Sequence, residues 1–397
     1  MYISHSSIFL AAYVTFNLVI AMASLARQLS GMKSVPRLRN VRSIHTARVA
    51  LLYQAIESPA INGVRKPAKP GGYQDGGADI AFNLGTQPGI NIITPVDSPN
   101  PREHAGWSFP DSEDGILAAL EKGATHLFAN TVVFASHPLQ MSERVREYQD
   151  QVKVIGHPPC MVELHDDKHY VNNMLRKSGQ FTLPRGWLFE DDGTNLDTRL
   201  NSLDLRFPIV GKPVRGRGSH GVKVCHDLAD LHAHAQSLFK ESPAIILEDF
   251  LAGEEATVTV MPPSEEHPFH WALPVVTRFN HVNGVAPWNG VVPVTANSRA
   301  VTADECAKDR TYTAIAAECE QVARLMGLTA VIRIDVRRFT KEPGSKFALF
   351  DTDFQVAIGQ ETRNLSQIAV VDDTAISTDA QFSADCGHMG TEIEGRF

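Results

Sequence analysis

FPIVGKPVRGRGSHG, residues Phe207–Gly221, joins a short apolar strand to a basic, glycine-rich loop. Its β-branched residues lie between two prolines, so we expect a short buried strand that delivers Lys212 to its end. The glycines let the backbone approach a ligand with its amide groups turned toward anionic oxygens. The residues that supply this flexibility and charge are Arg215, Gly216, Arg217, Gly218, Ser219 and Gly221. The stretch predicts a nucleotide-phosphate clamp, although a solvated hairpin can have the same composition.

The composition is that of a globular protein. The chain has 397 residues, of which 43% are hydrophobic and 21% charged, enough for two or three domains. Its net charge of -8 argues against a general nucleic-acid or anionic-membrane surface, so basic clusters are interpreted as local sites. Five scattered cysteines without CxxC spacing indicate neither a disulfide framework nor a zinc site. These features predict a cytoplasmic, reducing environment.

The N-terminal extension, residues 1–45, leaves the location open. Ile8–Leu25 is mostly apolar and long enough for a membrane anchor, and no acid follows it until Glu57, whereas several basic residues do. Three interpretations remain: a membrane anchor, a mitochondrial presequence, and an extension without function. We expect membrane association only if residues 8–25 are a genuine anchor.

From Val49 onward, short apolar runs alternate with turn residues, which predicts βα units and a small α/β domain over residues 46–157. Within it we expect a loop at Pro67–Gly77 and a charged surface helix at Ser142–Gln151. Pro158-Pro159 begins a second domain, 158–355. The polar segment 356–397, almost without periodicity, predicts a divergent or disordered tail.

The second domain contains further elements around the clamp. Asp166–Lys177 has the pattern of a helix, and Ala244–Phe250 is an apolar strand that ends in two acids. Asn283-Gly284 predicts a hairpin turn. Asp304–Met326 is the longest helical pattern, followed by Gly327 as a C-cap.

Two apolar strands near residue 350 carry carboxylates. Asp335 lies in the first strand, and Asp351 and Asp353 lie two residues apart, on one face of the second. If the strands form a hairpin, all three can face one space, and oxygen donors on rigid strands suit Mg²⁺. Arg333 would point the same way and could stabilise developing negative charge. A solvated hairpin face is the alternative.

Taken in order, these motifs resemble the ATP-grasp superfamily, specifically the D-alanine–D-alanine ligase-like carboxylate-amine ligases. The resemblance covers about Pro158–Asp353 and implies an α/β (α+β) ATP-grasp fold with a preceding small α/β N-terminal domain. It implies Lys212 and Arg333 as catalytic residues, with ATP and Mg²⁺ (or Mn²⁺) as cofactors. Metal ligands would be Asp335, Asp351 and Asp353. ATP contacts would come from Lys168, Lys212, Arg217, Gly218, Ser219, the hinge residues Glu248, Asp249, Phe250 and Leu251, and Glu255 on the ribose.

The implied activity is amide or peptide bond formation between small-molecule carboxylate and amine substrates, through an acyl-phosphate. The family usually has Glu-x-Asn followed by a proline-containing loop, where this chain has Asp351-Thr352-Asp353 and FQVAIGQ. Two alternatives therefore stay open: a catalytically impaired ATP-binding regulatory or partner-binding protein, and a small-molecule kinase. We expect no nucleic-acid partner, and a homodimer is left open.

Overall fold

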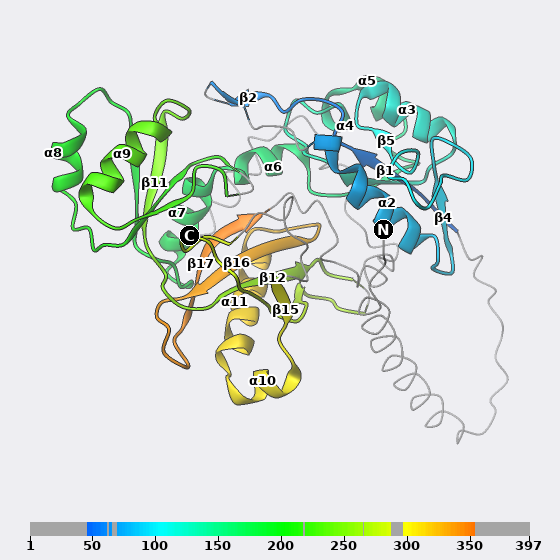
Figure 1. Ribbon diagram of the computed structural model, residues 1–397. Coiled ribbons are helices and arrows are strands. Elements are labelled where there is room, and N and C mark those ends of the chain that lie inside the picture. Colours follow the sequence, from blue (N-terminus) through cyan, green and yellow to red (C-terminus); the bar gives the residue numbers. More distant parts are fainter. Residues whose placement is uncertain are drawn as a thin grey trace, which may run out of the picture. The chain divides into compact units, whose positions relative to one another are not determined.

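The computed structural model describes residues 46–61, 63–65, 70–216, 219–264, 266–286 and 297–353. The expected extension at 1–45 and tail at 356–397 lie outside these ranges, and the domain boundaries remain predictions. The fold is of the α/β class that the sequence predicts, with sheets and helices throughout the described part of the chain (Figure 1).

The first region contains a parallel sheet in the order β4-β1-β6-β7, with β5 also paired to β1. Parallel strands joined by helices are the βα arrangement that the alternating apolar runs predict. Its elements are β1 (Ala47–Tyr53), β2 (Ala60–Ile61), β3 (Val64–Arg65), a 3-10 turn η1 (Pro70–Tyr73), α2 (Gln74–Leu84), β4 (Ile90–Ile93), β5 (Phe109–Pro110), α3 (Glu113–Glu121), β6 (His126–Asn130), α4 (Pro138–Met141), α5 (Glu143–Arg146) and β7 (Lys153–Ile155).

A second, antiparallel sheet holds the opening strand of the clamp. Its order is β10-β9-β11-β8, and Lys212 on β9 pairs with Ile246 on β11. Two helices, α6 (Pro159–His165) and α7 (Lys168–Ser178), precede this sheet in the chain. The remaining elements are β8 (Gly186–Glu190), α8 (Leu196–Asn201), β9 (Ile209–Pro213), β10 (Lys223–Cys225), α9 (Leu228–Leu238) and β11 (Ala244–Asp249).

The third sheet carries the predicted carboxylates. Its strands run antiparallel in the order β15-β14-β12-β16-β17, with β13 also paired to β12. Its elements are β12 (Glu255–Met261), β13 (Trp271–Ala272), β14 (Val276–Arg278), β15 (Ser298–Ala300), α10 (Ala303–Lys308), α11 (Thr311–Leu325), β16 (Ile332–Arg338) and β17 (Phe347–Asp353).

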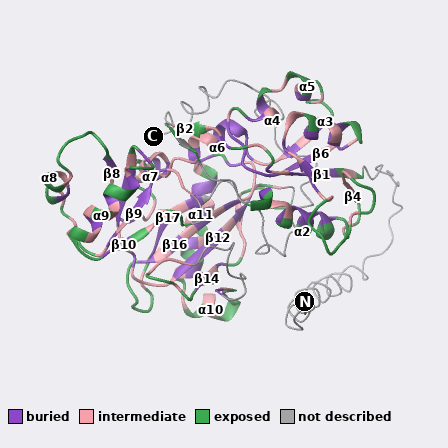
Figure 2. Ribbon diagram, turned by 45° about the horizontal axis from the view of Figure 1, so that its top comes forward, coloured by how far each residue is buried: buried purple, intermediate pink, exposed green. Residues whose placement is uncertain are grey.

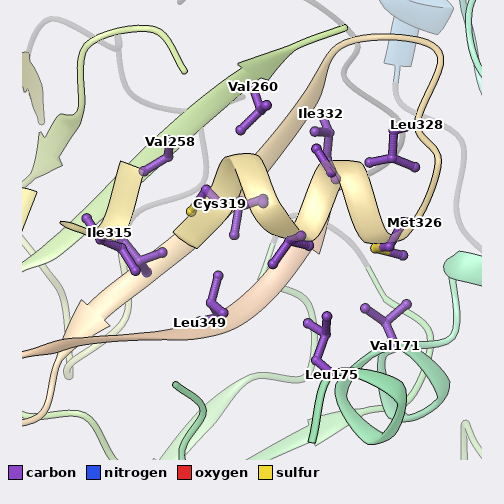
Figure 3. Packing of buried hydrophobic residues seen from close by; sticks show 14 of the residues in the cluster. Val171, Leu175, Val258, Val260, Ile315, Cys319, Met326, Leu328, Ile332 and Leu349 are labelled. Carbon is purple, nitrogen blue, oxygen red and sulfur yellow. The ribbon is translucent and has the colours of Figure 1, made fainter. Parts of the chain in front are cut away.

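One face of this sheet forms the largest core cluster. Helix α11 lies across it and inserts Ile315, Cys319 and Met326 among residues of β12, β16 and β17 (Figure 3). Val171 and Leu175 of α7 complete the cluster, so the helix that begins at Lys168 is anchored on the same core. Buried residues are concentrated along these strands (Figure 2).

Three local expectations need correction. Helix α2 begins at Gln74, inside the loop expected at Pro67–Gly77. The helix expected at Ser142–Gln151 contains only α5, whose final residue is Arg146. The pattern Asp304–Met326 is two helices, because Asp309 is extended and its carboxylate accepts from Thr311 while binding Arg338 Nη2 at 2.8 Å.

Two predictions of turn residues are confirmed. Asn283 and Gly284 both have positive φ, of 51° and 80°, as a two-residue hairpin turn requires, and Val282 and Val285 bridge across it. Gly327 has a φ of 61° immediately beyond the helix α11 and its C-cap, Met326.

Candidate ATP and metal site

The floor of the candidate site is the face of the third sheet opposite the core. Along β16 the burial alternates, so Ile332, Ile334 and Val336 are in the core while Arg333, Asp335 and Arg337 lie on the other face. Directly paired residues of antiparallel strands share a face. The register pairs Arg337 with Glu255 of β12, Asp335 with Thr257 of β12 and Asp351 of β17, and Arg333 with Asp353.

The predicted hairpin is confirmed, and it contains a β-bulge. Asp335 pairs with Asp351 but Val336 pairs with Leu349, so Phe350 is the extra residue of β17. The Phe350 carbonyl accepts a hydrogen bond from Lys212 Nζ at 2.8 Å. The bulge thereby joins the clamp strand β9 to the carboxylate strand.

Lys212 is one half of a buried ion pair. Its Nζ lies 2.7 Å from Glu248 Oε2, and the two side chains are only 5% and 3% exposed. Glu248 Oε1 accepts a second hydrogen bond, from Asn172 Nδ2 of α7 at 3.0 Å. Because a buried charge is costly without partners, this network holds the lysine in one place.

Lys168 lies at the start of α7, where Asp167 caps the helix by accepting from the Tyr170 amide at 2.9 Å. Its Nζ is 2.5 Å from Asp351 Oδ1. Partial burial favours the neutral form of Asp351, but the charges of Lys168, Lys212 and Arg333 outweigh it and hold the pKa of that carboxyl below its usual value. Asp351 is therefore an anion at neutral pH.

The second predicted metal ligand, Asp335, is held by two neighbours. Thr257 Oγ1 donates to Asp335 Oδ1 at 2.7 Å, and Arg333 Nε lies 3.3 Å from the same oxygen. Asp335 is thus oriented by the neighbouring strand β12 and by a residue of its own strand, β16. Arg333 lies beside the predicted ligand, as the sequence suggested.

A divalent cation fits this donor set in its chemistry. Asp335 and Asp351 are paired carboxylates on one face, and hard cations such as Mg²⁺ prefer one or two carboxylates completed by water and phosphate oxygens. Among the side chains that the structure describes, no three His, Cys, Asp or Glu residues cluster closely enough to hold a metal. The third predicted ligand, Asp353, has a side chain outside the described set, so its role stays a prediction.

The predicted hinge connects β11 to β12. Glu248 faces Lys212, whereas the carboxylate of Asp249 points to Arg185, with Nε 2.7 Å from Oδ2. Leu251 is buried, at 4% exposed. The guanidinium of Arg337 lies over the ring of Phe250, with Cζ 4.8 Å from the ring centroid. The four hinge side chains therefore contact different groups. The prediction that adenine binds here applies to the segment as a whole, and it does not require each side chain to contact the base.

Glu255, predicted to hold the ribose, is 5% exposed and surrounded by basic groups. His281 Nε2 lies 2.9 Å and Arg337 Nη1 3.4 Å from Oε2, and Arg278 Nε lies 3.9 Å from Oε1. Burial lowers the pKa of Arg337, which Glu255 counteracts. These basic partners are not among the residues that the sequence motifs predict, although the alternation along β16 places Arg337 on the face of Asp335.

The loop of the clamp is described only in part. Arg215 binds the junction of α6 and α7, with Nη1 3.3 Å from Asp166 Oδ2. Ser219 is exposed and has a φ of 59°. Arg217 and Gly218 lie outside the described residues. The clamp's base is thus fastened to the helix that carries Lys168.

No helix in the described part of the chain combines the length and apolar character needed to cross a membrane. The apolar stretch 8–25 lies outside that part.

Part of the chain resembles known proteins in sequence. A model described as "D-ala D-ala ligase C-terminus" matches residues 196–347. A D-alanine–D-alanine ligase of Aquifex aeolicus (strain VF5) is 32% identical over 95 residues, which are 24% of this chain and 31% of that protein. One from Syntrophotalea carbinolica (strain DSM 2380 / NBRC 103641 / GraBd1) is 34% identical over 55 residues, 14% and 18% of the two chains. The alignments span about a third or less of these curated relatives.

Solved structures extend the likeness to most of the chain. The D-alanine–D-alanine ligase of Bacillus anthracis has a TM-score of 0.54 at 13% identity, covering 88% of this chain and 98% of that one. VanG D-Ala:D-Ser ligase from Enterococcus faecalis has a TM-score of 0.53 at 12% identity, covering 88% and 99%. At these identities the likeness concerns the fold. The described part of the chain therefore has the fold of the D-alanine–D-alanine ligases, and residues 196–347 match the model of their C-terminal domain.

Proposed function

We propose that the protein is an ATP-dependent carboxylate-amine ligase that acts on small molecules. The observation that carries the proposal is the convergence of two lysines, Lys168 and Lys212, on a sheet face that bears Asp335 and Asp351. Positive groups for phosphates, beside paired carboxylates for a cation, are what phosphoryl transfer requires, because its catalysis is mostly positioning and charge neutralisation. The D-alanine–D-alanine ligase-like family supports the same chemistry.

Each residue group has a part in the proposed reaction. Lys168 and Lys212 would bind phosphate oxygens of ATP, and Asp335 and Asp351 would hold Mg²⁺ or Mn²⁺, which when bound neutralises charge on those oxygens. The hinge residues Glu248–Leu251 would receive the adenine. Arg217, Gly218 and Ser219 would cover the phosphates, and Asp353 would complete the metal ligands.

The proposed chemistry has two steps. A substrate carboxylate oxygen attacks the γ-phosphorus of ATP, and the bond to ADP breaks, which leaves an acyl-phosphate. An amine then attacks the acyl carbon, phosphate departs and the amine loses a proton, so an amide forms. Arg333 lies on the floor beside Asp335, where its charge would stabilise the negative oxygens of both steps. No protein nucleophile is needed.

The test is an assay of the purified chain with ATP, Mg²⁺ and pairs drawn from a pool of amino and organic acids that includes D-alanine. We expect ADP release that requires both a carboxylate and an amine, with a product whose mass is the sum of the two minus water. A stable phosphorylated product would indicate a kinase instead. ATP binding without ADP release under any pair would indicate a regulatory protein that has lost ligation.

A further inference from the structure

The two carboxylate oxygens of Glu255 have unequal contacts. Its close contacts, from His281 Nε2 at 2.9 Å and Arg337 Nη1 at 3.4 Å, are both to Oε2. Arg278 Nε is 3.9 Å from Oε1, beyond hydrogen-bond distance. Binding one oxygen firmly, with Oε1 at a distance from Arg278, suits a carboxylate that must accept a further hydrogen bond from a ligand.

Arg337 connects three segments at this point. Besides its contact with Glu255, its Nε donates to the Gly253 carbonyl at 3.2 Å and its Nη1 donates to the Gly284 carbonyl at 2.7 Å. Its guanidinium also stacks on Phe250 of the hinge. A planar guanidinium with five donors can make these contacts together, which a lysine ammonium cannot reproduce.

The turn that Arg337 fastens lies against the hinge. A Cβ added to Gly284 would be 3.1 Å from Val224 Cγ2 and 3.4 Å from Phe250 Cε2, so the turn backbone is packed on both side chains. The same short segment supplies His281 to Glu255. Moving the turn would therefore move a partner of the carboxylate.

From these contacts we infer that Arg337 is a positioning residue that aims Glu255 at the ribose of the nucleotide and so sets the preference for ribonucleotides over deoxyribonucleotides. The inference rests on the proposed function, because it takes ATP as the ligand, and on the prediction that Glu255 binds the ribose. Arg337 acts through Glu255 and the turn, without a part in the bond changes.

The experiment compares equilibrium binding of Mg²⁺-ATP and Mg²⁺-2′-deoxy-ATP by calorimetry in the full chain. Since a hydrogen bond to a charged group contributes enough for about tenfold or more in affinity, the unaltered protein should prefer ATP by about that factor. Arg337→Met keeps much of the side chain's length but removes the donors, and should reduce the preference to about twofold or less. Arg337→Lys should recover only part of it.

Matched variants make the result specific. Arg299→Met, in the same sheet but in an exposed pair with Glu305, should keep the full preference. His281→Gln, which loosens the other partner of Oε2, should reduce it even if Arg337→Met fails to fold. If Arg337→Met folds and keeps the full preference for ATP, the inference is wrong. If Arg337→Met does not fold, an unchanged preference in His281→Gln has the same meaning. Neither result would affect the proposed function. Absence of any ATP binding by the unaltered chain would instead overturn the proposed function on which it rests.

Discussion

Lys168 and Asp351 form an ion pair across the candidate site, with Nζ 2.5 Å from Oδ1. The lysine predicted for a phosphate thus binds the carboxylate predicted for the cation. When ATP and Mg²⁺ bind as proposed, Lys168 would pair with a phosphate instead of Asp351, and Asp351 would pair with the cation instead of Lys168. The charge balance of the site is thereby preserved without burying an isolated charge.

Asp351→Asn should abolish most turnover while keeping the shape of the site. Because the amide carries no charge, the cation loses an anionic ligand, and we expect kcat to fall by about 100-fold or more. ADP release measured over a Mg²⁺ titration checks this. ATP binding in the presence of a chelator is the control, and it should be retained. Full turnover in the variant would exclude Asp351 as a ligand.

Lys212→Met should affect both stability and nucleotide binding. The change leaves Glu248 with only a more distant cation, Arg176, whose Nη2 is 3.9 Å from Oε1. We therefore expect a loss of up to about 3 kcal/mol in the free energy of unfolding, measured by denaturant titrations. The double variant Lys212→Met with Glu248→Gln should recover much of that stability without recovering ATP affinity. If affinity returned with stability, the lysine would be structural only.

Thr257→Val tests the orientation of Asp335. The hydroxyl donates to Asp335 Oδ1 at 2.7 Å, and loss of such an outer contact to a metal ligand weakens metal affinity by about 10–100-fold. The measurement is the Mg²⁺ concentration that gives half-maximal ADP release. Thr259→Val, two residues along the same strand face, is the matched control and should leave that concentration within about twofold. Equal effects in both variants would contradict the prediction.

Stability should fall on mild acidification because of two buried histidines. Burial lowers the pKa of His157 from 6.5 to about 4 and that of His165 from 6.5 to about 3. In the unfolded chain both histidines become protonated near pH 6.5, whereas in the folded chain they stay neutral to a lower pH. Stability is therefore lost as the pH falls from 6.5 toward 4. At pH 5 the loss is about 2 kcal/mol for each histidine.

Denaturant titrations at pH 7 and pH 5 measure this loss. His157→Asn should show a smaller difference between the free energies of unfolding at pH 7 and pH 5. His104→Gln, at an exposed position, should show the full difference. An identical difference in the buried variant would contradict the assignment.

The elements that local chemistry specifies were predictable from sequence. The carboxylate hairpin followed from alternation and its turn, and Asn283-Gly284 followed from the positive φ that such a turn requires. The break at Asp309 has one local signal, because its carboxylate accepts hydrogen bonds from Thr311 two residues along, but it also depends on Arg338, which is distant in sequence. Local patterns contain no signal for the contact with Arg338.

The same division holds for the site. Lys212, Asp335 and Asp351 were identified from their positions in strands, and the structure brings them together. Their partners were missed, because Glu248 and Thr257 become neighbours of these residues only through strand register between separate segments. Arg337 could have been found, since it lies two residues beyond Asp335 and strand side chains alternate.

The bulge at Phe350 decides which way the carboxylates point. Leu349 lies in the core, so regular alternation would turn Asp351 inward as well, and the one extra residue reverses this. Asp351 therefore faces outward because of a residue that is neither a proposed ligand nor part of the main core cluster. A mutation that straightened the strand would exchange its two faces beyond the bulge. Asp351 would then be buried and Thr352 exposed, although no proposed ligand had been replaced.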